Sequence, residues 1–270
     1  MRRLINQRPA RPTAVLLSLL PFVLAILAYA MASEARLEAN PNDKLLPGLG
    51  AMMAAIDRMA FTPDIRSGDY LLWADTQSSL IRLGTGVLIA TVIGGVIGVL
   101  QGLIPYVRTT MTTFVGVIAM IPPLAILPIL FIVFGLGETS KIVLIVIGIL
   151  PFIVRDVAFR TEELPREQII KAETLGAGTW QILLRVVVPQ MLPRLLGGVR
   201  LSLGAAWLFL IAAEAIASQT GLGYRIFLMR RYLAMDVIIP YVAWITLLAF
   251  LTDYLLGLLQ RRGFPWLYRS

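Results

Sequence analysis

The sequence contains no cysteine and no histidine. The chain therefore has no thiol nucleophile, no disulfide, no zinc site of the usual kind and no histidine for acid–base catalysis. Charged residues are also scarce, at 15%, whereas hydrophobic residues reach 58%, above the roughly 45–50% of an ordinary soluble domain. These absences predict a protein that lies in lipid, binds no metal and is not an enzyme.

Acidic residues are too few to balance the basic ones, and the net charge is +8. In a soluble protein this excess would suggest nucleic acid as a partner, but the lysines and arginines of a membrane protein collect at the cytoplasmic ends of its helices. The basic residues near the two ends of the chain are Arg2, Arg3, Arg8 and Arg11, then Arg261, Arg262 and Arg269. We therefore predict lipid contact, no nucleic-acid partner, and both termini in the cytoplasm.

Six long apolar segments make up almost half of the chain, at positions 13–32, 83–104, 114–134, 142–159, 195–217 and 237–259. Each is long enough to cross a hydrocarbon core of about 30 Å, and in lipid such segments must be helices. The first segment is longer than the apolar region of a signal peptide and is predicted to be retained. We expect an all-α integral membrane protein with six transmembrane helices, in which a single domain, 13–259, lies between cytoplasmic tails at 1–12 and 260–270.

Glycines and prolines interrupt the apolar segments at two places. Gly94, Gly98 and Gly102 recur every four residues in the second segment, which predicts close packing of a neighbouring helix. Pro122 and Pro123 interrupt the third segment, where proline removes a helical hydrogen bond. They either kink the helix for packing or free carbonyl groups near a translocation path, which Met120 would also line.

Two connecting segments show helical periodicity of their own. In the outer segment 34–77, an apolar stripe formed by Leu49, Met52, Met53, Ile56 and Ala60 predicts an amphipathic helix at the outer surface. The inner loop 160–194 predicts a helix, a break at a glycine, and a second helix that ends at a proline.

A phosphate-binding loop is not evident in the sequence. The nearest string, at 135–141, lacks the second glycine and the serine or threonine that such a loop requires, and it lies between two apolar segments. If the chain belongs to an ATP-driven machine, the ATPase is another chain.

The inner loop resembles the cytoplasmic coupling motif of bacterial ABC importer permeases. That motif runs Glu-Ala-Ala, three residues, Gly, nine residues, and Ile-x-Leu-Pro, and the distance between Gly176 and Pro189 fits it. Ile170 and Lys171 stand where the family has Glu and Ala. The resemblance implies that the contacts with the ATPase are made by Lys171, Ala172, Glu173, Thr174, Leu175, Gly176, Ala177 and Pro189.

Further segments are similar to permeases of the nitrate, sulfonate and taurine importer group, namely 79–86, 121–141, Glu214 and 221–224. The resemblance implies a type I permease in a bacterial inner membrane, present as a homodimer with two cytoplasmic ATP-binding subunits and an extracytoplasmic substrate-binding protein. ATP and magnesium would then lie on the ATPase, with no cofactor on this chain. The stretch 167–176 also resembles a subgroup that suggests urea- or guanidine-like solutes. The alternative function is a stand-alone secondary transporter or channel.

Glu214 is an acid inside the fifth apolar segment, where burial of a charge is costly. With Trp207 on the same helical face, it lines the translocation path, or it pairs structurally with an arginine, such as Arg200 or Arg82, or caps backbone at the outer interface. A second charged group, Arg225, Arg230, Arg231 and Asp236, either docks the substrate-binding protein or is a solvated loop.

The charged tails yield a test of topology. Because the chain lacks cysteine, a single cysteine placed at Ser270 reacts alone with a thiol reagent. We expect an impermeant maleimide to label Ser270→Cys only after the cells are opened. Labelling of intact cells would contradict six spans with both ends inside.

Overall fold

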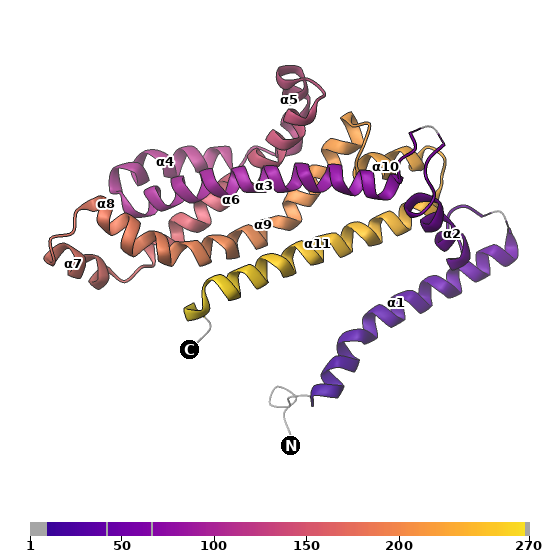
Figure 1. Cartoon of the computed structure of the whole chain (residues 1–270), viewed down its shortest axis with the longest axis horizontal. Coiled ribbons are helices and arrows are strands. Elements are labelled where there is room, and N and C mark those ends of the chain that lie inside the picture. Colours follow the sequence, from indigo (N-terminus) through magenta and orange to yellow (C-terminus); the bar gives the residue numbers. More distant parts are fainter. Residues whose placement is uncertain (1–9, 42, 66, 268–270) are drawn as a thin grey trace.

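The computed structural model describes residues 10–41, 43–65 and 67–267, and every regular element in them is a helix (Figure 1). The tail positions 1–9 and 268–270, which carry three of the N-terminal arginines and Arg269, lie outside the described residues. Within the described part, five helices are long and apolar enough to cross a membrane, and a bent helix pair makes a sixth span if it is counted as one. The five are α1 (Arg11–Ala39), α3 (Leu71–Leu103), α6 (Glu138–Glu162), the run Thr179–Ala217 and α11 (Met235–Gly263). The predicted all-α membrane fold is confirmed.

Helices α3 and α6 form the most extensive helix–helix contact of the bundle. A Cβ atom added at Gly98 would lie 2.7 Å from the Val157 side chain and 2.9 Å from the Val154 carbonyl oxygen, both on α6. Gly94 and Gly102 approach α6 in the same way. The predicted packing role of this glycine stripe is confirmed, since small residues let helix backbones come together.

The third predicted span, 114–134, is not one continuous helix. The chain forms α4 (Pro105–Ile118), a short 3₁₀ turn η2 (Pro123–Ile126) and α5 (Leu127–Phe134), with a bend of 77° between the two halves. Figure 1 shows α5 projecting away from α4. The bend has a direct cause, because Pro122 and Pro123 have no N–H to continue the hydrogen bonds of α4.

The sequence predicted that the second helix of the inner loop ends at a proline, but the helix continues past Pro189. Helix α8 (Thr179–Ile182), a π-helical turn η3 (Leu183–Val187) and α9 (Val188–Ala217) form one run, in which Pro189 and Pro193 are internal. In the π turn the Val188 N–H bonds the Leu183 carbonyl, one residue further back than in an α-helix. This wider turn lies next to the proline, which lacks the N–H of a regular helical bond, and the helix continues.

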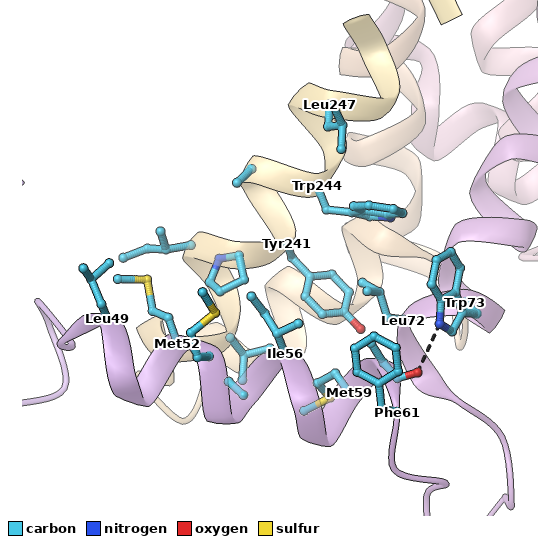
Figure 2. Close-up of a pocket in the computed structure, with 17 residues that line it drawn as sticks. Leu49, Met52, Ile56, Met59, Phe61, Leu72, Trp73, Tyr241, Trp244 and Leu247 are labelled. Carbon is cyan, nitrogen blue, oxygen red and sulfur yellow. Dashed lines mark hydrogen bonds between the residues drawn. The ribbon is translucent and has the colours of Figure 1, made fainter. Parts of the chain in front are cut away.

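The predicted outer amphipathic helix is present as α2 (Leu49–Ala60). Rather than only lying on a surface, α2 packs against the start of α11 and encloses an apolar groove of about 600 Å³ (Figure 2). The Trp73 indole N–H closes one end of the groove by donating to the Ala60 carbonyl at 3.1 Å. Helix α1 does not pack into the bundle, since none of the residues in its most apolar stretch is buried.

The glycine contact between α3 and α6 generates a stability test. Gly98→Ala adds a methyl group that has no room, whereas Gly84→Ala, on an open face of the same helix, meets no atom within 4 Å. We expect Gly98→Ala to lower stability by about 1–3 kcal/mol, as overpacking does. Thermal unfolding in detergent measures it, and equal melting temperatures for the two variants would contradict the packing role.

Candidate coupling and translocation sites

The inner loop forms an exposed helix that ends in a glycine. Helix α7 (Arg166–Thr174) is followed by Gly176, whose φ of +81° is left-handed. The N–H groups of Gly176 and Ala177 donate to the carbonyls of Glu173 and Ala172, at 2.9 and 3.0 Å. This pair of bonds is a Schellman motif, in which glycine is the residue without steric penalty. The predicted end of the helix at Gly176 is therefore present.

The loop presents apolar side chains outward although it connects two spans. Those of Ile170, Leu175, Trp180 and Leu184 are 56–80% exposed. Lys171, Ala172, Glu173 and Thr174 lie in α7, Ala177 follows the glycine, and Pro189 lies in α9. A side-chain bond of 2.9 Å from Gln190 to Gln168 holds α7 to α9. An exposed apolar face on a positioned helix is the form of surface that a partner protein covers.

At the opposite end of the bundle, Glu214 is completely buried and paired. Its carboxylate accepts hydrogen bonds from Arg82 Nη1 at 2.7 Å, Ser79 Oγ at 2.8 Å and the Gly223 N–H at 2.9 Å. Arg82 also pairs with Glu138 at the start of α6. Of the two candidate partners, Arg82 is the one used, whereas Arg200 pairs with Asp253 at 2.8 Å. The arrangement supports the structural interpretation of Glu214.

A second buried acid, Asp75, was missed by the sequence analysis. It accepts bonds from Arg225 Nε at 2.8 Å and from the Gly221 N–H at 2.9 Å. Asp75, Ser79 and Arg82 are spaced four and three residues apart on α3, so they share one face. That spacing of polar residues at the head of an apolar helix was the available signal.

The predicted outer charged cluster is divided in the structure. Arg225, in α10 (Leu222–Arg230), is committed to Asp75, and Asp236 pairs with Arg58 at 3.5 Å. Arg230 lies over the Phe227 ring at 5.3 Å, and Arg231 is exposed. Two of the four charges therefore stabilise this end of the bundle.

The break between α4 and α5 opens a cavity of about 690 Å³ against α3 and α6. Pro123 lines it, while the neighbouring Met120 is 83% exposed and Pro122 is exposed beside it. Trp207 and Glu214, the other predicted path residues, are buried on α9 and do not line this cavity. The structure thus brings the residues of the break together and separates them from the two on α9.

These features match a known family. A family model described as "Binding-protein-dependent transport system inner membrane component" matches residues 90–263, which include the loop, the cavity and Glu214. The chain belongs to this family. As one of its permeases, it is 37% identical over 198 residues to the taurine transport system permease protein TauC of Escherichia coli, covering 73% of this chain and 72% of that protein.

Other relatives carry different names. The putative aliphatic sulfonates transport permease protein SsuC of Bacillus subtilis is 28% identical, over 83% of this chain and 82% of its own. The bicarbonate transport system permease protein CmpB of Synechococcus elongatus is 30% identical, over 74% and 70%. A permease chain from inward-facing structures of the MetNI methionine ABC transporter superposes with a TM-score of 0.62 at 22% identity, over 72% of this chain and 96% of that one. It shares the type I importer permease fold.

The buried pair predicts a specific defect. Glu214→Gln leaves Arg82 buried with half of its compensation, and breaking such a pair costs about 3–5 kcal/mol. We expect a lower folded yield and melting temperature with no change in which solute is carried. Glu163→Gln, which removes an exposed acid 3.9 Å from Arg194, is the control. Normal yield together with altered solute preference would assign Glu214 to the path.

Proposed function

We propose that this chain is the membrane-spanning subunit of an ATP-driven importer and forms the path for a small polar solute. Membership of a binding-protein-dependent permease family supports this function. The observation that carries it is the exposed helix α7, ended by the left-handed Gly176, at the end of the bundle opposite Glu214 (Figure 1). An exposed short helix followed by a loop with exposed apolar side chains suits a groove on a soluble ATPase.

The proposed assembly contains two copies of the chain, two ATP-binding subunits in the cytoplasm and an extracytoplasmic substrate-binding protein. ATP and magnesium bind the ATPase subunits, and this chain binds no cofactor. Closure of the ATPase pair moves α7, and the bundle alternates between two packings whose balance the partners shift by a few kcal/mol. The membrane is the bacterial inner membrane, and α7 and both termini face the cytoplasm.

The proposed solute is a small oxyanion or a related zwitterion. The relatives are named for the transport of taurine, aliphatic sulfonates and bicarbonate. A urea- or guanidine-like nitrogen compound is the second candidate, from the resemblance of residues 167–176. A stand-alone transporter is disfavoured because Glu214 and Asp75 are held by partners within the chain, whereas ionisable relays exchange theirs.

The coupling role is tested at Gly176. Gly176→Asp forces a side chain into left-handed backbone at a point where nothing in the chain would clash. We expect normal membrane insertion, loss of ATPase binding or of its stimulation by the loaded binding protein, and uptake at background. The three readouts are taken on one preparation, so that coupling is separated from stability.

Gly178→Asp is the matched control. Gly178 lies two residues further along the loop with an ordinary φ of −75° and caps α8, a position that favours aspartate. It should keep the ATPase and most of the uptake. Full uptake by Gly176→Asp with the ATPase bound would show that the loop is not the coupling element.

A further inference from the structure

The cavity at the α4–α5 break is lined in part by polar side chains. Its lining includes Gln101 from α3, with Arg155, Asp156 and Glu162 from α6. Gln101 lies near the end of α3 and Glu162 at the end of α6, and both helices end on the side of the bundle that carries α7 (Figure 1). For an importer this is the side from which solute leaves.

One wall of the cavity offers hydrogen-bond acceptors. Gln101 is 5% exposed, and its Oε1 atom has no partner among the described residues. Its orientation follows from its neighbour: Thr112 Oγ donates to the Arg108 carbonyl at 2.7 Å and can therefore only accept from Gln101 Nε2, at 3.2 Å. The Ala119 carbonyl, also in the lining, receives no helical hydrogen bond because Pro123 has no N–H.

Arg155 adds a positively charged hydrogen-bond donor to the lining of the cavity. Both acids of the lining are already neutralised, Asp156 by Arg160 at 2.9 Å and Glu162 by Arg108 at 3.0 Å. Arg155 is exposed, and no acid among the described residues pairs with it. The cavity thus combines a cation without a counterion and acceptors without donors.

We propose that this cavity is a transit site for a small zwitterion, in which Arg155 binds the oxyanion end and Gln101 Oε1 accepts a hydrogen bond from the ammonium end. The proposal rests on the proposed importer function and narrows its solute class. A guanidinium holds an oxyanion by paired N–H donors, and an amide oxygen with no donor of its own favours a ligand that supplies one. A solute with only one of these groups leaves the other wall unsatisfied.

The absence of cysteine makes the site directly testable. Ile121 lines the cavity and is 45% exposed, so Ile121→Cys places one thiol there while Arg155 and Gln101 remain. In the permease–ATPase complex, aminoethanesulfonate at about ten times its Kd should slow labelling by a methanethiosulfonate about ten-fold, since only the empty site reacts. Hydroxyethanesulfonate, which lacks the ammonium group, should protect far less. Thr109→Cys, exposed on α4 outside the cavity, should react equally with and without solute.

A second substitution in the Ile121→Cys variant tests which residue binds each end of the solute. Added to Ile121→Cys, Arg155→Gln should abolish protection by both solutes, and Gln101→Leu should abolish the preference for the amine. Arg262→Gln, an exposed arginine at the end of α11, should change neither. If Arg155→Gln fails to fold, Arg155→Lys keeps the charge and should keep part of the protection.

The outcomes separate the site from the importer function. Labelling needs no transport, whereas ATP-driven uptake by the complete importer reports on the function. Normal uptake of aminoethanesulfonate without protection of Ile121→Cys would overturn the site, and equal protection by both solutes would overturn the zwitterion assignment. Absence of any ATP-driven uptake by the unsubstituted complex would overturn the proposed function itself.

Discussion

The ion pair between Arg82 and Glu214 is the contact on which one whole end of the bundle depends. An ionised group in a membrane helix is tolerated only when partners replace water, and here those partners come from α3, α6, α9 and the first turn of α10. Ser79 serves twice, since its hydroxyl donates to Glu214 and accepts from the Leu222 N–H at 2.9 Å. Because each group satisfies the next, none of these elements can shift without exposing a buried charge. The Asp75–Arg225 pair extends the same constraint to α10.

The other end of the bundle is built differently. Its cavity contains an acceptor and a cation that have no partner in the described part of the chain, and its loop exposes apolar side chains. The two ends are joined by the continuous run Thr179–Ala217, which at 39 residues is about 58 Å long. The exposed helix α7 lies just before this run in the chain, and the far end of the run is held by the contacts of Glu214. The end of the bundle that contains Glu214 is therefore held by paired charges. The end near α7 instead has exposed apolar side chains and, among the described residues, polar groups without partners.

Local features were predictable from sequence, and long-range pairings were not. The repeat of Gly94, Gly98 and Gly102 predicts close helix packing, and Gly176 predicts the end of a helix. Both predictions need only the positions of residues along one helix. Pro122 and Pro123 indicated a break in the third span. The average hydropathy of the segment does not reveal the bend, because the residues on both sides of the prolines are apolar. Pro189 misled for a related reason: a π turn accommodates the proline, and nothing in local composition specifies that turn. The choice of Arg82 over Arg200 for Glu214 depends on how separate helices pack.

Hydrogen bonding also distinguishes polar groups that stabilise the fold from polar groups that could bind a solute. The Glu214 carboxylate accepts hydrogen bonds from Ser79 Oγ at 2.8 Å, from Arg82 and from the Gly223 N–H, so both of its oxygens have donors. A carboxylate whose charge is paired and whose two oxygens both accept hydrogen bonds within the fold does not bind a passing solute unless the fold opens. Transient binding instead requires groups whose partners are missing in the empty protein. Within the described residues the cavity beside the broken span has such groups, and for that reason the path is better sought there than at the most conspicuous buried acid of the sequence.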